Sequence, residues 1–255
     1  MSELRRDDLQ NGYFLWQDPS MFCFGIDAVL LSHYPEIKDG DSVADLGTGF
    51  APIPHMMHAD ARRRGIRIRI TGIEIQERAA LLAERSVREN GLDGDIRIIH
   101  GDLKEAVSLC GAASFSLVVS NPPYVKRGSG LVGKDEAKAA ARSELFCTFE
   151  DVASQAAALL RPKGRFAMIH RPGRLPELFG VLKKYRLEPK RMRLVCPYAD
   201  ADASMVLLEA VKGVRPGLKA EPPLIVYHRD QTYTEEVLRI YGGNTVSHRD
   251  ADRKS

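Results

Sequence analysis

Short apolar runs that end in glycine or in an acidic residue recur along the first half of the chain. The runs "SVADLG", "IRITGIEI", "DIRIIHGD" and "FSLVVSN" have the valine and isoleucine content of buried strands. Helix-like stretches such as "QERAALLAERSVREN" separate them, and "RFAMIH", "RMRLVCP" and "ASMVLLEA" add three strands later in the chain. This alternation predicts an α/β fold with a doubly wound, mostly parallel sheet of seven strands.

The same pattern divides the chain into three segments. Residues 1–36 are expected to form an N-terminal arm, and residues 37–212 carry the alternation of strands and helices. Residues 213–255 contain a strand-like "LIVYH" and a helix-like "TEEVLRIYG". We expect this last segment to be a C-terminal appendage rather than a domain.

Composition excludes several classes of protein. Hydrophobic residues make up 44% of the 255 residues and charged residues 28%, which is typical of a globular chain. The start, "MSELRRDDLQ", lacks the apolar core of a signal peptide, and no apolar run approaches the ~20 residues of a membrane helix. The four cysteines are scattered, so neither a disulfide framework nor a metal site is indicated. We therefore expect a cytoplasmic protein without a membrane segment.

Positive charge is concentrated in two stretches although the net charge is only +3. Five arginines lie between residues 62 and 69, and six lysines and arginines lie between residues 183 and 193. Solvated helix ends and phosphate contacts explain such clusters equally well. Charge by itself therefore does not decide whether the chain binds nucleic acid.

A turn with two glycines follows the first predicted strand. In "DLGTGF", Gly47 and Gly49 allow a tight turn and a close approach of the backbone to a ligand, and Asp45 lies at the end of the strand. The third glycine of the dinucleotide fingerprint is missing, since Ala51 and Pro52 follow, and the Gly-Lys-Ser/Thr ending of a phosphate-binding loop is absent. The turn predicts a cofactor site but not which cofactor it binds.

Acidic residues at the ends of the next two strands help to identify the cofactor. Glu74 ends the second strand, where a carboxylate can accept the hydroxyl groups of a ribose, and Asp102 ends the third. A dehydrogenase would explain Glu74 but not the Asn-Pro-Pro-Tyr that follows the fourth strand. S-adenosylmethionine explains both: its ribose would contact Glu74, its adenine amine Asp102, and its methionine end the glycine turn.

The sequence "NPPY" ends the fourth strand with Asn121, Pro122, Pro123 and Tyr124. The exocyclic amine of a base is a poor nucleophile because its lone pair is delocalised. The side-chain oxygen of Asn121 and the carbonyl of Pro122 can accept its two N–H groups and direct the lone pair at a methyl group. The two prolines restrict the backbone of this segment, and Tyr124 offers a flat ring for stacking. These four residues are the predicted catalytic group, and Asn121 also adjoins the cofactor.

The motifs "DLGTG", "GIEI", "GDL" and "NPPY", in this order, resemble those of class I S-adenosylmethionine-dependent methyltransferases, which have a Rossmann-like fold. Enzymes that methylate adenine N6 and those that methylate a glutamine of peptide release factors both carry NPPY. The arm "WQDPSMFCFGIDAVLLSHY", with "HRPGRL" and "EPKRMR", resembles the bacterial tRNA adenine-N6 methyltransferases that act on position 37, just 3′ of the anticodon. Ile26 and Ser143 replace a threonine and a histidine of that family.

The resemblance implies S-adenosylmethionine as cofactor and tRNA as partner. The arm would cover the cofactor, with Gly25 and Asp27 near its methionine end, although Asp27 is equally well explained as a helix N-cap. Candidate RNA contacts come from five basic residues: Lys126, Arg127, Arg142, Arg171 and Arg174.

Three other functions stay open at this point. A release-factor glutamine methyltransferase usually has a helical domain before the first strand, whereas only about 40 residues precede Asp45 here. A DNA adenine methyltransferase would need a target-recognition domain that the sequence does not indicate. A non-catalytic RNA-binding module with a methyltransferase fold is the third, and the intact NPPY argues against it. The sequence gives no indication of the oligomeric state.

Overall fold

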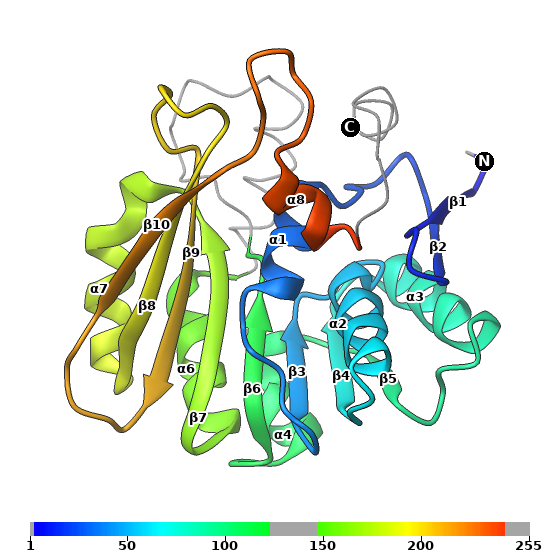
Figure 1. The fold of residues 1–255 in the computed structure, drawn as a ribbon. Helices are drawn as coiled ribbons and strands as arrows, with labels where there is room; N and C mark the ends of the chain where they lie inside the picture. Colours follow the sequence, from blue (N-terminus) through cyan, green and yellow to red (C-terminus); the bar gives the residue numbers. More distant parts are fainter. Residues whose placement is uncertain (1–2, 123–146, 243–255) are drawn as a thin grey trace.

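A mixed β-sheet with helices on both faces forms the body of the molecule (Figure 1). The computed structural model describes residues 3–122 and 147–242. All seven predicted strands are present: β3 (Ser42–Leu46), β4 (Arg69–Glu74), β5 (Ile96–His100), β6 (Phe115–Ser120), β7 (Leu160–His170), β8 (Leu187–Cys196) and β9 (Met205–Lys212). The main sheet has the order β10-β8-β9-β7-β6-β3-β4-β5, so the predicted α/β fold class is confirmed.

The sheet contains an eighth strand, which the sequence analysis did not count. Strand β10 (Lys219–Ile225) pairs parallel with β8 at the edge of the sheet, whereas β9 runs antiparallel to both β7 and β8. Pro222 and Pro223, which cannot donate to a ladder, precede the strand-like "LIVYH" of the sequence analysis. Here both prolines lie at an irregularity in an edge strand, the position in which a sheet tolerates them.

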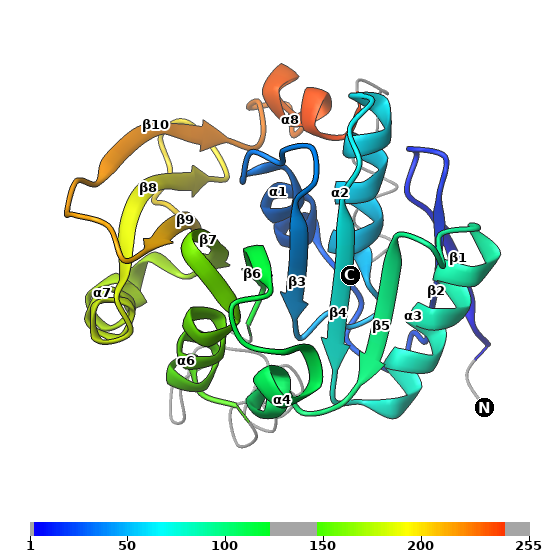
Figure 2. The same cartoon turned by 90° about the horizontal axis from the view of Figure 1, so that it is seen from below.

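Two hydrophobic cores lie on opposite faces of the sheet. In β6, Leu117 and Val119 belong to one core and Val118 to the other, as the alternation of side chains along a strand requires. The first core includes side chains of α1 (Ile26–His33), α2 (Pro52–Arg63) and α3 (Glu77–Glu89). The second includes side chains of α6 (Phe149–Leu159) and α7 (Leu175–Lys184), and η1 (Leu103–Glu105) and α4 (Ala106–Cys110) lie on the same side (Figure 2).

An antiparallel hairpin, absent from the sequence-based prediction, forms part of the N-terminal arm. Strands β1 (Arg5–Asp8) and β2 (Phe14–Gln17) lie beside α3, at the β5 end of the sheet (Figure 1). The backbone N–H of Trp16 donates to Ser86 Oγ (2.9 Å), and Asn90 Nδ2 donates to the Phe14 carbonyl (2.8 Å). These bonds attach the arm to the helix that follows β4.

The C-terminal helix α8 (Glu235–Ile240) packs against the body rather than standing apart from it. Thr234 caps the helix, and its Val237 is fully buried in the core that contains α1. The guanidinium of Arg193 in β8 binds both carboxylate oxygens of Glu236, at 2.7 and 2.9 Å. Within residues 3–122 and 147–242, no helix is both long and apolar enough to span a membrane.

Candidate functional site

The predicted site residues gather where the strand order of the sheet reverses. The chain continues from β3 to β4 on one side, and β6 pairs with β3 on the other. These strands are parallel, so their carboxyl ends lie at one edge of the sheet. In α/β folds ligands bind at such a switch point. Asp45, Glu74 and Asn121 all lie at this edge, at or next to the ends of β3, β4 and β6.

The turn after β3 has the backbone conformation that its glycines predicted. Gly47 and Gly49 have φ angles of +78° and +57°. The N–H groups of Gly47 and Thr48 both donate to the Ile73 carbonyl at 3.0 Å, which holds the turn against β4. A Cβ atom built on either glycine would meet no atom of the described residues within 4 Å. The turn therefore borders open space in which a ligand can approach its backbone.

Ala51 ends the turn in a left-handed conformation. It is fully buried, with φ of +62°, immediately before α2. Such a conformation is uncommon for alanine. Pro52, at the position of the fingerprint's third glycine, is the first residue of α2.

Asp45 is a fully buried carboxylate with one unsatisfied oxygen. Its Oδ2 accepts a hydrogen bond from Thr48 Oγ1 (2.6 Å), and its Oδ1 has no partner among the described residues. The pKa of Asp45 is raised to about 7, chiefly by burial; the Thr48 bond lowers this pKa and the charge of Glu74 raises it. A buried acceptor without a donor is costly, so Asp45 Oδ1 is suited to accept a hydrogen bond from a bound ligand.

Glu74 connects the turn to the end of β4. Its Oε2 accepts from the Gly49 N–H (2.8 Å) and its Oε1 from the Gln76 N–H (2.9 Å), and its side chain is almost fully buried. Each carboxylate oxygen has a second lone pair, with which it can accept a hydroxyl group. The arrangement is compatible with the predicted ribose contact, which stays a prediction.

Asp102 has a local structural role at the end of β5. Its Oδ1 accepts from the Lys104 N–H (2.9 Å) and caps η1, and its Oδ2 lies 3.3 Å from Lys104 Nζ. The side chain is partly exposed. A contact with the adenine of a cofactor remains a prediction for this residue.

The strongest link between the arm and the predicted catalytic group is a hydrogen bond from Asn121 to Asp27. Asn121 Nδ2 donates to Asp27 Oδ2 at 2.9 Å across 94 residues of sequence. Because the amide nitrogen is the donor, the acceptor role falls to Asn121 Oδ1. Asp27 is not the N-cap of α1: Gly25 is, and Asp27 lies in the first turn, where its Oδ1 accepts from the Ala28 N–H. The N-cap explanation of Asp27 is therefore wrong.

The two described RNA candidates have protein partners. The exposed Arg171 donates to the Ser204 carbonyl (3.1 Å), and Arg174 pairs with Glu177 in the next turn (2.5 Å). Their role with RNA stays a prediction. The other named candidates lie outside the described residues: Pro123, Tyr124, Lys126, Arg127, Arg142 and Ser143.

Two hydroxyl groups that the sequence analysis passed over help to fix the site. Thr48 is the donor to Asp45, and Ser120 Oγ donates to the Leu46 carbonyl (2.8 Å), joining the ends of β6 and β3. The threonine lies inside the glycine motif and the serine immediately before NPPY, so position relative to a motif was the available signal. No group of three or more side chains that could hold a metal ion occurs in the part of the chain that the structure describes.

Comparison with known proteins identifies a family. Residues 13–175 match the model of the methyltransferase small domain. A protein of Porphyromonas gingivalis named tRNA1(Val) (adenine(37)-N6)-methyltransferase is 32% identical over 191 residues, which cover 72% of each chain. A protein of the same name from Aeromonas hydrophila subsp. hydrophila is 26% identical over 85% of this chain and 87% of its own.

Solved structures agree with the fold. A protein of Agrobacterium tumefaciens described as a predicted O-methyltransferase has a TM-score of 0.67 and 24% identity, covering 87% of this chain and 98% of its own. A geranyl diphosphate methyltransferase in complex with S-adenosylmethionine has a TM-score of 0.54 and 16% identity, covering 73% and 84%. At these identities the similarity concerns the fold alone.

Proposed function

The chain belongs to the methyltransferase small domain family, and from this membership we propose that it transfers a methyl group from S-adenosylmethionine to the exocyclic amine N6 of an adenine in tRNA. The adenine is the one 3′ of the anticodon, at position 37. Similarity to the two tRNA methyltransferases supports this assignment because it covers 85% of this chain in one case and 72% in the other. An enzyme that acts on tRNA belongs in the cytoplasm.

The residues at the sheet edge fit S-adenosylmethionine. Asp45 Oδ1 is a buried acceptor without a donor, and the glycine turn borders open space. Asp45 and the turn at Gly47 and Gly49 would hold the methionine end, with Gly25 and Asp27 close by. Glu74 would bind the ribose, and Asp102 the adenine amine. When bound, the cofactor supplies an electrophilic methyl group on a positively charged sulfur.

Asn121 and Pro122 act on the nucleophile. Asn121 Oδ1 accepts one N–H of the adenine amine, and the Pro122 carbonyl accepts the other. Holding both N–H groups favours a pyramidal nitrogen whose lone pair faces the methyl group. Tyr124 would stack on the base. A strong base is not required, because the amine can release its proton after the transfer.

The observation that carries the proposal is the bond from Asn121 Nδ2 to Asp27 Oδ2. It holds the amide in the orientation in which Oδ1 is the acceptor, as binding of an amine N–H requires. It also joins the arm, which resembles that of the tRNA methyltransferases, to the residue predicted to bind the reacting nitrogen.

Methyl transfer from labelled S-adenosylmethionine tests the proposal directly. Unmodified tRNA, double-stranded DNA and a peptide release factor are offered in parallel, and the tRNA product is digested to nucleosides. We expect label in tRNA only, recovered as N6-methyladenosine at position 37. Asn121→Ala should abolish the transfer, while calorimetry should find its affinity for S-adenosylmethionine nearly unchanged.

Three outcomes would contradict the proposal. Label in the release factor would show that the substrate is a glutamine side chain. Label in DNA would show that the substrate is a different nucleic acid. Cofactor binding without transfer to any of the three would indicate a binding protein. A fully active Asn121→Ala variant would refute the mechanism.

A further inference from the structure

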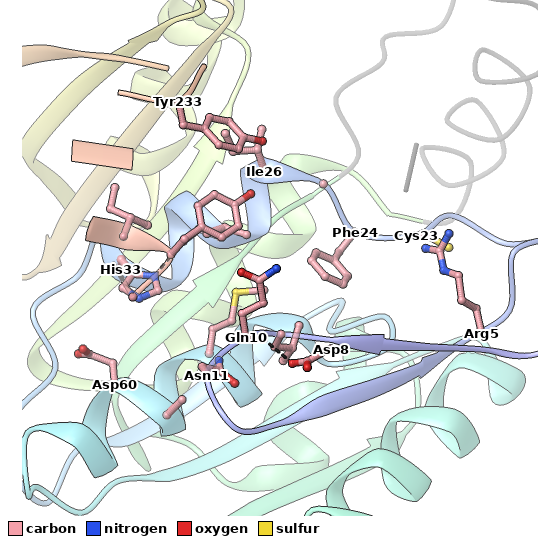
Figure 3. Close-up of a pocket in the computed structure, with 18 of the residues that line it drawn as sticks. Arg5, Asp8, Gln10, Asn11, Cys23, Phe24, Ile26, His33, Asp60 and Tyr233 are labelled. Carbon is pink, nitrogen blue, oxygen red and sulfur yellow. Dashed lines mark hydrogen bonds between the residues drawn. The ribbon is translucent and has the colours of Figure 1, made fainter. Parts of the chain in front are cut away.

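A cavity of about 500 Å³ lies beside the predicted methyl-transfer site (Figure 3). Its walls come from the tip of the β1–β2 hairpin, from the segment between β2 and α1, and from α1, α2 and the region around α8. The volume falls in the range of ligand pockets, about 300 to 1,000 Å³. Of the residues assigned above to cofactor and catalysis, Gly25 lines it, whereas Asp45, Glu74 and Asn121 do not.

One side of the cavity is aromatic. Tyr227, Tyr233 and Tyr241 line it, and their rings form a continuous stack with centroid distances of 5.1 and 5.4 Å. From the arm, the ring of Phe24 points into the same hollow (Figure 3). Tyr233 is only 4% exposed, so a flat ligand would stack on Phe24 or on the outer rings of the stack, Tyr227 and Tyr241.

The polar groups of the cavity suit a neutral ligand with a hydrogen-bonding edge. Gln10 and Asn11 bring side-chain amides, which carry both donors and acceptors. The charges of Asp60 and Arg63 compensate each other, since Arg63 Nη2 lies 2.6 Å from Asp60 Oδ1, and Arg5 pairs with Asp7 (2.9 Å). The carboxylate of Asp8, which accepts the Gln10 N–H, adds a further hydrogen-bond acceptor. A nucleobase combines a flat ring with an edge of donors and acceptors and carries no charge.

The cavity and the predicted site share one wall. Gly25 lines the cavity and is also the N-cap of α1, and two residues later Asp27 binds Asn121. A strand of RNA that presents one base to Asn121 would therefore pass close to the mouth of the cavity. Phe22, which is 79% exposed, lies on the same segment.

We propose that this cavity binds the base of an unpaired nucleotide that neighbours the target adenine. The inference rests on the proposed function, because it takes a single-stranded loop as the substrate. Bases of an anticodon loop are unpaired and can turn outward at low cost. Holding a second base fixes the direction of the strand and selects among loops that differ next to the target.

The test combines a change in the cavity with a change in the RNA. Ala59 in α2 lines the cavity, and Ala59→Phe fills it without removing a contact. Ala112→Phe is the matched control, at an exposed position outside the cavity. The RNA is an anticodon stem-loop, either intact or with one abasic site at each loop position in turn. Dissociation constants are measured by fluorescence anisotropy with S-adenosylhomocysteine present.

We expect the abasic site and the cavity variant to weaken RNA binding by the same mechanism, so that their effects do not add. With the unchanged protein, one abasic position next to the target adenine should weaken binding about tenfold, as the loss of a base stack does. Ala59→Phe should weaken binding of the intact loop to a similar extent, and the same abasic site should then have no further effect. Ala112→Phe should behave like the unchanged protein.

A second variant guards against misfolding. Phe24→Ala removes a ring from the cavity, and it should also abolish the penalty of that abasic site while calorimetry finds cofactor affinity unchanged. Abasic penalties that are equal in the unchanged protein and both cavity variants would overturn the inference, even if tRNA is methylated normally. Absence of methyl transfer to tRNA by the unchanged protein would instead refute the proposed function and the inference with it.

Discussion

At the scale of single residues, the carboxylate of Asp27 orients the side chain of Asn121. It is almost fully buried, lies in the first turn of α1 and accepts the amide N–H of Asn121 at 2.9 Å. An amide has two nearly symmetric orientations, and the bond selects the one that presents the oxygen as acceptor. Asp27 is thus a positioning residue in the proposed mechanism.

Replacing Asp27 should therefore affect turnover more than binding. We expect Asp27→Ala to lower kcat by up to about 100-fold, the size of effect that a small misplacement of a reacting group can cause. The affinity for S-adenosylmethionine should change little. Asp27→Asn, which keeps an acceptor oxygen, should retain more activity. Single-turnover kinetics with tRNA measure the effect, and an Asp27→Ala enzyme with normal kcat would disprove the positioning role.

At the scale of elements, the contact between β4 and the glycine turn decides the shape of the site. Gly72 in β4 lies against Thr48: a Cβ at this glycine would be 2.8 Å from Thr48 Cγ2 and 2.9 Å from Oγ1. Thr48 is the residue that donates to Asp45. Any side chain at position 72 must therefore displace the turn that borders the predicted cofactor site.

Two glycine replacements should therefore change the free energy of unfolding in opposite directions. Gly72→Ala should lower the free energy of unfolding by about 1–3 kcal/mol, as overpacking does, and weaken cofactor binding. Gly180→Ala, in the interior of α7 where a Cβ meets nothing within 4 Å, should raise it by about 0.5–1 kcal/mol. Urea denaturation measures both changes. A stable Gly72→Ala variant with normal cofactor affinity would show that the turn can yield.

At the scale of the whole molecule, ionisable groups inside the fold make its stability depend on pH. His170 ends β7 with 1% of its surface exposed, and its Nδ1 accepts the Arg171 N–H (2.8 Å). The pKa of His170 is lowered to about 4, chiefly by burial and also by the charge of Arg174, while Glu177 acts in the opposite direction. The folded state therefore keeps this imidazole neutral when the unfolded chain, with a pKa near 6.5, binds a proton.

The stabilisation from a neutral His170 is complete above pH ~6.5 and is lost as the pH falls toward 4. The variant His170→Asn keeps an acceptor but does not titrate. Relative to this variant, the unchanged protein should lose up to about 3 kcal/mol between pH 6.5 and pH 4, at about 1.4 kcal/mol per pKa unit. Thermal unfolding at a series of pH values measures the difference, which should be constant above pH 7. If the difference in stability between the two proteins did not vary with pH, His170 would not be buried as a neutral imidazole.

The fold class could be predicted because the information lies in short stretches of sequence. The apolar runs at Val43, Ile70, Leu117 and their neighbours have strand composition, and the glycines at 47 and 49 mark the turn that the structure contains. The hairpin β1–β2 escaped because "RRDD" is too polar to indicate a strand, and tertiary contacts such as those with α3 stabilise it. The strand-like "LIVYH" overlaps only the last two residues of β10, and the rest of this strand escaped because its prolines are tolerated only at an edge.

By itself, the sequence determined which residues end the parallel strands, because the periodicity of side chains and the positions of glycine and proline are local properties. It therefore placed Asp45, Glu74 and Asn121 at one edge of a sheet. Only the tertiary structure decided that Asp27 binds Asn121, that Glu74 accepts two backbone N–H groups, and that the arm and α8 enclose a cavity beside them. Contacts between distant residues depend on how whole elements pack, and no short stretch of sequence contains that information.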